Sequence, residues 1–87
     1  MNKVILSGKV FDVFDIDATV GMFTIQVDQK YFYVYYEKQL YGDLNIKREK
    51  VGIIGTLEYI KVRLPEQERV KRLVAIRLED IEVINDV

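Results

Sequence analysis

The sequence contains no cysteine, no histidine and no tryptophan, and it has a single proline. Without cysteine the chain forms no disulfide and offers no thiolate nucleophile or thiolate metal ligand, and without histidine it lacks the usual general base. Glycine-rich phosphate loops and nucleophile elbows are absent as well. We therefore expect a protein that is not an enzyme, that needs no cofactor and that resides in a reducing cytoplasm.

Segments for membrane insertion and export are also missing. No apolar run approaches the roughly 20 residues of a membrane helix, and no charged-then-apolar leader precedes "NKVILSG". The acidic cluster of Asp12, Asp15 and Asp17 lacks the alternating ligands and the glycine of a calcium loop. We interpret it as an acidic loop and expect neither a metal site nor membrane association.

Length and composition predict one domain, spanning residues 1–87. Apolar residues make up 49% of the chain and charged residues 31%, so the chain can bury one modest core and remain soluble. Five stretches rich in Val, Ile, Phe and Tyr have strand character, at residues 2–14, 20–28, 31–37, 50–64 and 70–84. Short turns join the second stretch to the third and the fourth to the fifth, and one or two helical turns are expected around residues 39–47.

The segment "YFYVYY", residues 31–36, is the most aromatic part of the chain. Strand side chains alternate between two faces, which separates Tyr31, Tyr33 and Tyr35 from Phe32 and Val34. Because Phe32 and Val34 carry no polar atom, we assign their face to the core. The three tyrosines are then expected to face solvent or a partner. The remaining strand aromatics are assigned to core or interface packing, namely Phe11, Phe14, Phe23, Tyr36 and Tyr59.

Positive charge concentrates in the predicted hairpin between the fourth and fifth strands. Residues 59–77 hold six cations against two carboxylates, although the whole chain has a net charge of −1. Five long strands with Gly8 and Gly55 at mid-strand, together with a short helical link, are typical of a small coiled barrel. We therefore predict an all-β, five-stranded OB-fold Greek-key barrel. This fold binds oligonucleotides on strands 2 and 3 and in the flanking loops. In the acidic end of the last strand, "LEDIEVI", we predict a bulge that returns Ile81 and Val83 to the core.

Three segments resemble bacterial single-stranded-DNA-binding proteins: "MNKVILSGKV", "VGIIGTL" and "LVAIRLEDIEVI". The resemblance implies that third-strand aromatics stack on bases, that Tyr31 occupies a base-stacking tryptophan position, and that the family's hairpin aromatic falls near Val62. It also implies a homo-oligomer, commonly a tetramer, with the first strand in a subunit interface. Such proteins usually continue into a flexible linker and an acidic tip, whereas this sequence stops at "NDV". Recruitment of partners by a tail is therefore not expected.

From the residues and the resemblance together we predict sequence-tolerant binding of single-stranded DNA in replication and repair, in the cytoplasm near the nucleoid. RNA is left open as a ligand, as is the choice between dimer and tetramer. The predicted contact residues are three stacking rings and five phosphate-binding cations: Tyr31, Tyr33, Tyr35, Lys61, Arg63, Arg69, Lys71 and Arg72. Two alternatives stay open. The same face could bind a protein, as in a replication-restart accessory factor, or the tyrosines could serve a purely structural oligomer.

Overall fold

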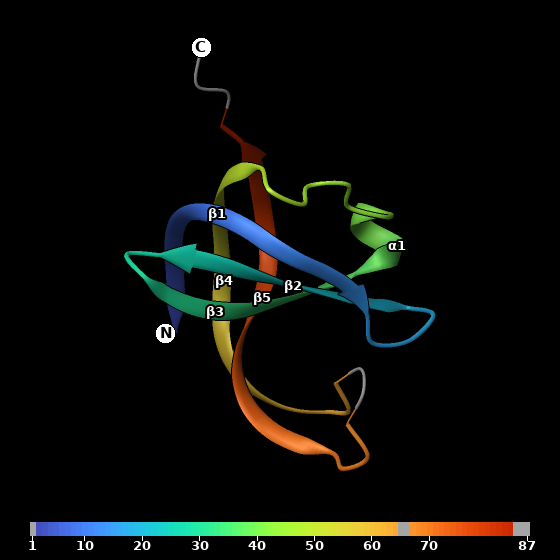
Figure 1. The fold of residues 1–87 in the computed structure, drawn as a ribbon. Coiled ribbons are helices and arrows are strands. Elements are labelled where there is room, and N and C mark those ends of the chain that lie inside the picture. Colours follow the sequence, from blue (N-terminus) through green and yellow to red (C-terminus); the bar gives the residue numbers. More distant parts are fainter. Residues whose placement is uncertain (1, 65–66, 85–87) are drawn as a thin grey trace.

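The computed structural model describes residues 2–64 and 67–84, which form five strands and one short helix (Figure 1). In chain order these are β1 (Lys3–Asp15), β2 (Val20–Val27), β3 (Lys30–Glu37), α1 (Lys38–Tyr41), β4 (Lys50–Val62) and β5 (Lys71–Val83). Each predicted strand is present, with bounds that differ by at most two residues from those expected. The predicted helical link is present as a single turn, which ends well before residue 47 because Gly42 has a φ of 67°.

The strands close into a barrel in the order β1-β2-β3-β5-β4. All neighbours are antiparallel except β3 and β5, which form a short parallel pair. β2 and β3 are joined by a two-residue turn in which Asp28 and Gln29 both have positive φ, the geometry of a tight hairpin. The prediction of an OB-fold barrel is confirmed.

Both mid-strand glycines lie where another backbone comes very close. β1 leaves β4 and begins to pair with β2 at Gly8 and Lys9, and a Cβ on Gly8 would overlap the carbonyl oxygen of Gln26. A Cβ on Gly55 would overlap the carbonyl oxygen of Arg77 in the same way. Glycine is therefore required at both positions, because a side chain would collide with the neighbouring strand.

The predicted bulge is present in β5. Ile54 pairs with Asp80 while Gly55 pairs with Leu78, which leaves Glu79 as the extra residue. After the bulge Ile81 packs against the core, as expected. Val83 is 42% exposed, so its assignment to the core was wrong. It lies at the very end of the strand, where the barrel no longer covers it.

The main core fills the barrel with buried side chains from every strand. Phe23, Val34 and Tyr36 belong to it, as the sequence predicted, and Tyr36 lies against both Phe23 and Tyr41. Phe32 is only partly buried but packs on the same cluster. The prediction that Phe32 and Val34 face the core is therefore confirmed.

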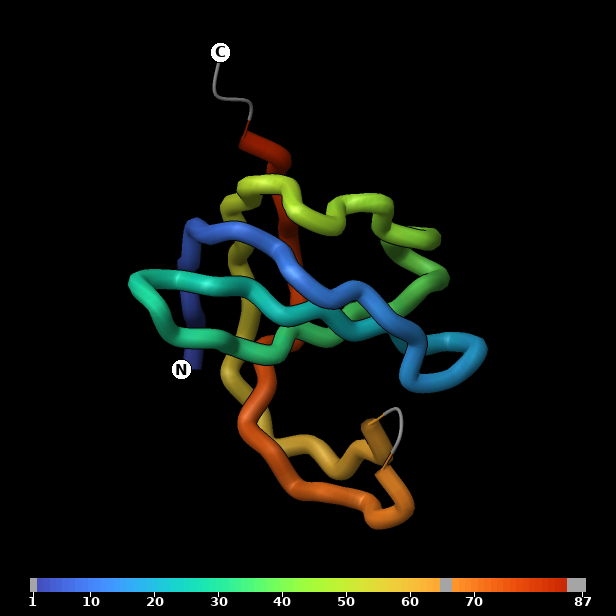
Figure 2. The backbone as a smooth tube through the Cα atoms, in the orientation of Figure 1, coloured from blue at the N-terminus to red at the C-terminus, as the bar shows by residue number. Residues whose placement is uncertain are grey.

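The β4–β5 hairpin extends well beyond the barrel and turns back beneath it (Figure 2). One side of this hairpin forms a second apolar cluster with the outer side of the barrel. Its buried members are Met22, Val62 and Leu64, and the partly buried members are Phe14, Ile16, Tyr33, Tyr35, Ile60 and Leu73. Phe14 thus has a packing role, as expected. The tip residues Pro65 and Glu66, which the sequence placed in a turn, lie outside the described residues, as does the "NDV" ending.

Candidate nucleic-acid interface

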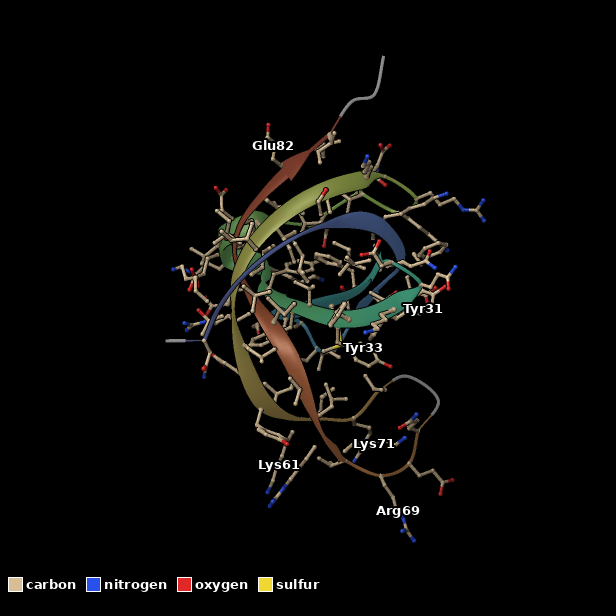
Figure 3. The ribbon with its side chains drawn as sticks, turned by 90° about the vertical axis from the view of Figure 1, so that its left-hand side faces the viewer. Tyr31, Tyr33, Lys61, Arg69, Lys71 and Glu82 are labelled. Carbon is tan, nitrogen blue, oxygen red and sulfur yellow. The ribbon has the colours of Figure 1, made fainter. Side chains whose placement is uncertain are left out.

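The outer surface of β1, β2 and β3 carries the tyrosine face, which we define as Tyr31, Tyr33 and Tyr35. Antiparallel partners place their side chains on the same side of a sheet. Tyr31 pairs with Gln26, which pairs with Lys9, and this row lies at one end of the face. Tyr33 pairs with Thr24 in the middle, and Tyr35 lies at the opposite end. Figure 3 shows Tyr31 farther from the hairpin than Tyr33.

The end around Tyr31 is open to solvent. Tyr31 is 60% exposed, and its ring meets the ring of Phe11 edge to face with centroids 5.7 Å apart. The Lys9 ammonium lies 5.6 Å from the Phe11 centroid, within cation–π range. Lys9, Phe11 and Tyr31 are called the open end from here on. It presents two rings and a positive charge.

Phe11 was missed as a candidate site residue and was assigned to packing, but it belongs to neither buried cluster. Only part of the signal is local to β1. Val10 is fully buried, so alternation along β1 places Lys9 and Phe11 together on the outer side.

Tyr33 and Tyr35 are partly buried, unlike Tyr31. Both rings pack against the second cluster, and the Tyr35 hydroxyl donates a hydrogen bond of 2.5 Å to the Glu58 carboxylate. Burial, together with this bond to a carboxylate, raises the pKa of Tyr35 to about 12. Glu58 in turn accepts from Arg77, whose Nε lies 3.2 Å away. The three tyrosines lie on one side of β3 as expected, but Tyr33 and Tyr35 are only partly accessible to solvent because the hairpin folds back over them.

A hollow of about 460 Å³ lies where the hairpin meets the barrel. Tyr33 and Thr24 line it on the barrel side, and Leu64 and Gln67 on the hairpin side. The side-chain oxygen of Gln67 is buried without a hydrogen-bond partner among the described residues. The hollow therefore adds a hydrogen-bond acceptor beside a tyrosine ring.

The five candidate cations are all exposed, and none forms an ion pair within the described part of the chain. They do not gather on one side. Lys71 pairs with Val62 on the side that faces the tyrosines, whereas Lys61 and Arg72 pair with each other on the far side. Figure 3 shows Lys61 and Arg69 pointing away from the barrel. Arg63 follows directly after β4. Arg77, which the charge count included, is held by Glu58.

The acidic loop has a local structural role. Asp17 accepts the backbone N–H groups of Thr19 and Val20 at 2.7 and 2.9 Å, and these bonds lower its pKa. Asp15 lies 2.8 Å from the Lys38 ammonium, and this contact raises the pKa of Lys38. Across residues 2–64 and 67–84 the structure contains no grouping of three or more potential metal ligands. No helix in this part of the chain is long and apolar enough to cross a membrane.

No protein-family model and no curated protein matches this sequence. Solved structures do match the fold. A complex of Plasmodium falciparum SSB with ssDNA matches with a TM-score of 0.64 and 18% identity, over 98% of this chain and 96% of that chain. A mitochondrial single-stranded DNA binding protein of S. cerevisiae matches with a TM-score of 0.68 and 11% identity, over 99% of this chain and 96% of that chain.

A Replication Protein A heterotrimer bound to ssDNA matches with a TM-score of 0.68 and 14% identity, over 99% of this chain. This chain spans 60% of the Replication Protein A chain that it matches. A protein identified as an aspartyl-tRNA synthetase from Leishmania major also contains the barrel, in 18% of its length and at 6% identity. At such identities the comparisons establish the fold, which is the OB-fold, and the function has to be argued from the site.

Proposed function

We propose that this OB-fold domain binds single-stranded DNA with little dependence on base sequence. The observation that carries the proposal is the open end, where the exposed Tyr31 ring meets the partly buried Phe11 ring beside the Lys9 ammonium. Sequence-tolerant binding of single strands uses rings on which bases stack and cations that follow the sugar-phosphate backbone. Two of the matching solved structures are complexes with ssDNA, which supports the choice of ligand.

In this proposal a base stacks on Tyr31, and Phe11 supports the ring from its edge. Stacking on an aromatic side chain contributes roughly 1–3 kcal/mol per base. Lys9 lies beside the stacked base, and Lys71 reaches the strand from the hairpin side that faces the tyrosines. Each phosphate that a cation neutralises changes the slope of log affinity against log salt concentration by about −0.7 on single strands.

We further propose that the domain acts without enzymatic activity of its own, in replication and repair, and as a homo-oligomer in the cytoplasm. Exposed apolar surface on the outer side of the barrel supports self-association. Ile5 is 76% exposed, and it lines a hollow of about 360 Å³ together with Ile54 and Ile84. Single exposed apolar residues are common on protein surfaces, but several that line one hollow indicate an interaction surface.

Fluorescence anisotropy of a labelled oligothymidylate tests the proposal, with the titration repeated at several salt concentrations and with the same strand as a duplex. We expect binding to the single strand that weakens as salt rises, with much weaker binding to the duplex. Equal affinity for both forms would contradict single-strand recognition. An absence of binding even at low salt would favour the competing function, a protein-interaction module that uses the same face.

A further inference from the structure

The far side of the β4–β5 hairpin, which faces away from the tyrosines, carries an exposed aromatic ring. Tyr59 is 80% exposed, more than any other large apolar side chain of the described residues. Val74 pairs with it across the hairpin and is 45% exposed. Of the two roles expected for Tyr59, core packing and interface packing, the first is excluded by this exposure.

Strand alternation explains why this side is open. Val51, Ile53 and Gly55 point into the barrel, and Leu57 and Tyr59 continue the same parity along β4. The barrel ends near Leu57, so the side of the hairpin that begins as the barrel interior emerges into solvent. The opposite parity, with Ile60 and Val62, packs against the barrel. Tyr59 therefore contributes to neither core.

The two charged residues that the described parts of β4 and β5 place on this far side, Lys61 and Arg72, are both cations. Lys61 and Arg72 are direct cross-strand partners, and like charges in this position destabilise a sheet unless an anion lies between them. The carboxylate of Glu58 belongs to the other parity and is held by Tyr35 and Arg77. Tyr59, Ile60, Lys61 and Arg72 line a hollow of about 540 Å³. A ring beside two adjacent cations fits a ligand that offers both a flat base and a phosphate.

We propose that the far side of the hairpin is a second binding surface for single-stranded nucleic acid, on which Tyr59 stacks a base and Lys61 and Arg72 bind the adjoining phosphates. This inference rests on the proposed function and enlarges its site. A strand that leaves Tyr31 passes Lys71 and Arg69 at the hairpin before it reaches Tyr59. Long strands then engage both sides of the hairpin, whereas short strands engage the open end and Lys71 but do not reach the far side.

Comparison of two strand lengths tests the inference. An OB-fold covers about 4–16 nucleotides, so oligothymidylates of about 6 and about 30 nucleotides separate the two surfaces. We expect Tyr59→Ala to weaken binding of the long strand by about fivefold or more and to leave the short strand unaffected. The number of nucleotides occluded per protomer should also fall. Leu40→Ala is the matched control, because Leu40 is an exposed apolar residue on α1 and lies away from both surfaces.

A second variant, Lys61→Gln with Arg72→Gln, should flatten the salt dependence for the long strand only. Sedimentation and thermal unfolding of each variant establish that its mass and fold are unchanged. If Tyr59→Ala binds both lengths like the wild type, the second surface is wrong and the proposed function stands. If Tyr59→Ala instead changes the oligomer mass with binding unchanged, Tyr59 belongs to a subunit interface and the inference is overturned. A wild-type protein that binds neither length would overturn the proposed function itself.

Discussion

Tyr31 and Tyr35 are the same residue type on the same side of the same strand, yet their surroundings differ completely. Tyr31 is 60% exposed and lies beside Phe11, whereas Tyr35 is packed beneath the hairpin and bonded to Glu58. The hairpin reaches one end of the tyrosine face and leaves the other open. Alternation along a strand thus determines which side a residue faces, but a segment far away in the sequence determines whether that side is free to bind.

The largest effect is expected on stability, at the covered end. Tyr35→Ala removes a packed ring and one of the two donors to the Glu58 carboxylate, so we expect a loss of about 2–4 kcal/mol in the free energy of unfolding. Tyr31→Ala should change that free energy by no more than about 0.5 kcal/mol, because the ring is exposed. Urea unfolding of both variants measures the difference. Equal losses would mean that the two ends do not differ as described.

The next effect is on binding, at the open end. Tyr31→Ala should weaken binding of a short oligothymidylate by roughly 5- to 150-fold, which corresponds to the loss of about 1–3 kcal/mol of stacking. Tyr31→Phe retains the ring and serves as the control, with affinity close to the wild type. Anisotropy titration measures both. An unaltered affinity in Tyr31→Ala would remove Tyr31 from the binding site.

A smaller effect concerns the Tyr35 hydroxyl and depends on pH. The folded state raises the pKa of Tyr35 from 10.0 to about 12, so folding favours the protonated phenol. Its contribution to stability is complete below pH 10 and is lost as pH rises from 10 to about 12. At neutral pH the free energy of unfolding of the wild type should exceed that of Tyr35→Phe by about 1 kcal/mol, which is the contribution of one hydrogen bond.

This prediction is tested by measuring the unfolding of the wild type and of Tyr35→Phe near neutral pH and again at about pH 11. The advantage of the wild type should shrink at the higher pH, since the phenylalanine variant has no group to ionise at that position. A constant difference would show that the Tyr35–Glu58 bond does not control the titration.

The smallest effect is expected from a single cation on the hairpin. Lys71→Gln should reduce the slope of log affinity against log salt by about 0.7 for short strands, because Lys71 lies on the side that faces the tyrosines. Lys61→Gln should leave the short-strand slope unaltered, since Lys61 lies on the far side. Identical slopes of log affinity against log salt in the two variants would mean that a short strand does not bind one side of the hairpin in preference to the other.

Much of the fold could be predicted from the sequence because its signals are local. Strand composition, the turn at Asp28, and the need for glycine at positions 8 and 55 are each visible within a few residues. The bulge could also be located, from the adjacent acids at Glu79 and Asp80.

The site was predicted less completely because it depends on contacts between distant segments. Sequence periodicity assigned Tyr31, Tyr33 and Tyr35 to one side, but the coverage of Tyr33 and Tyr35 depends on how far the hairpin extends and which way it bends. The register between β4 and β5 determines that Lys71 lies on one side of the hairpin and that Lys61 and Arg72 lie on the other. The position of Phe11 beside Tyr31 depends on the pairing of β1 with β2, which sequence periodicity does not give.

The most direct test of the central claim is a titration of isotope-labelled protein with an unlabelled short oligothymidylate, followed by amide chemical shifts in NMR spectra. We expect the largest shifts at the open end and at Gln26 beside it, with further shifts at Lys71 on the hairpin. Shifts confined to the opposite outer surface around Ile5 and Ile54, or an absence of shifts at Tyr31, would contradict it.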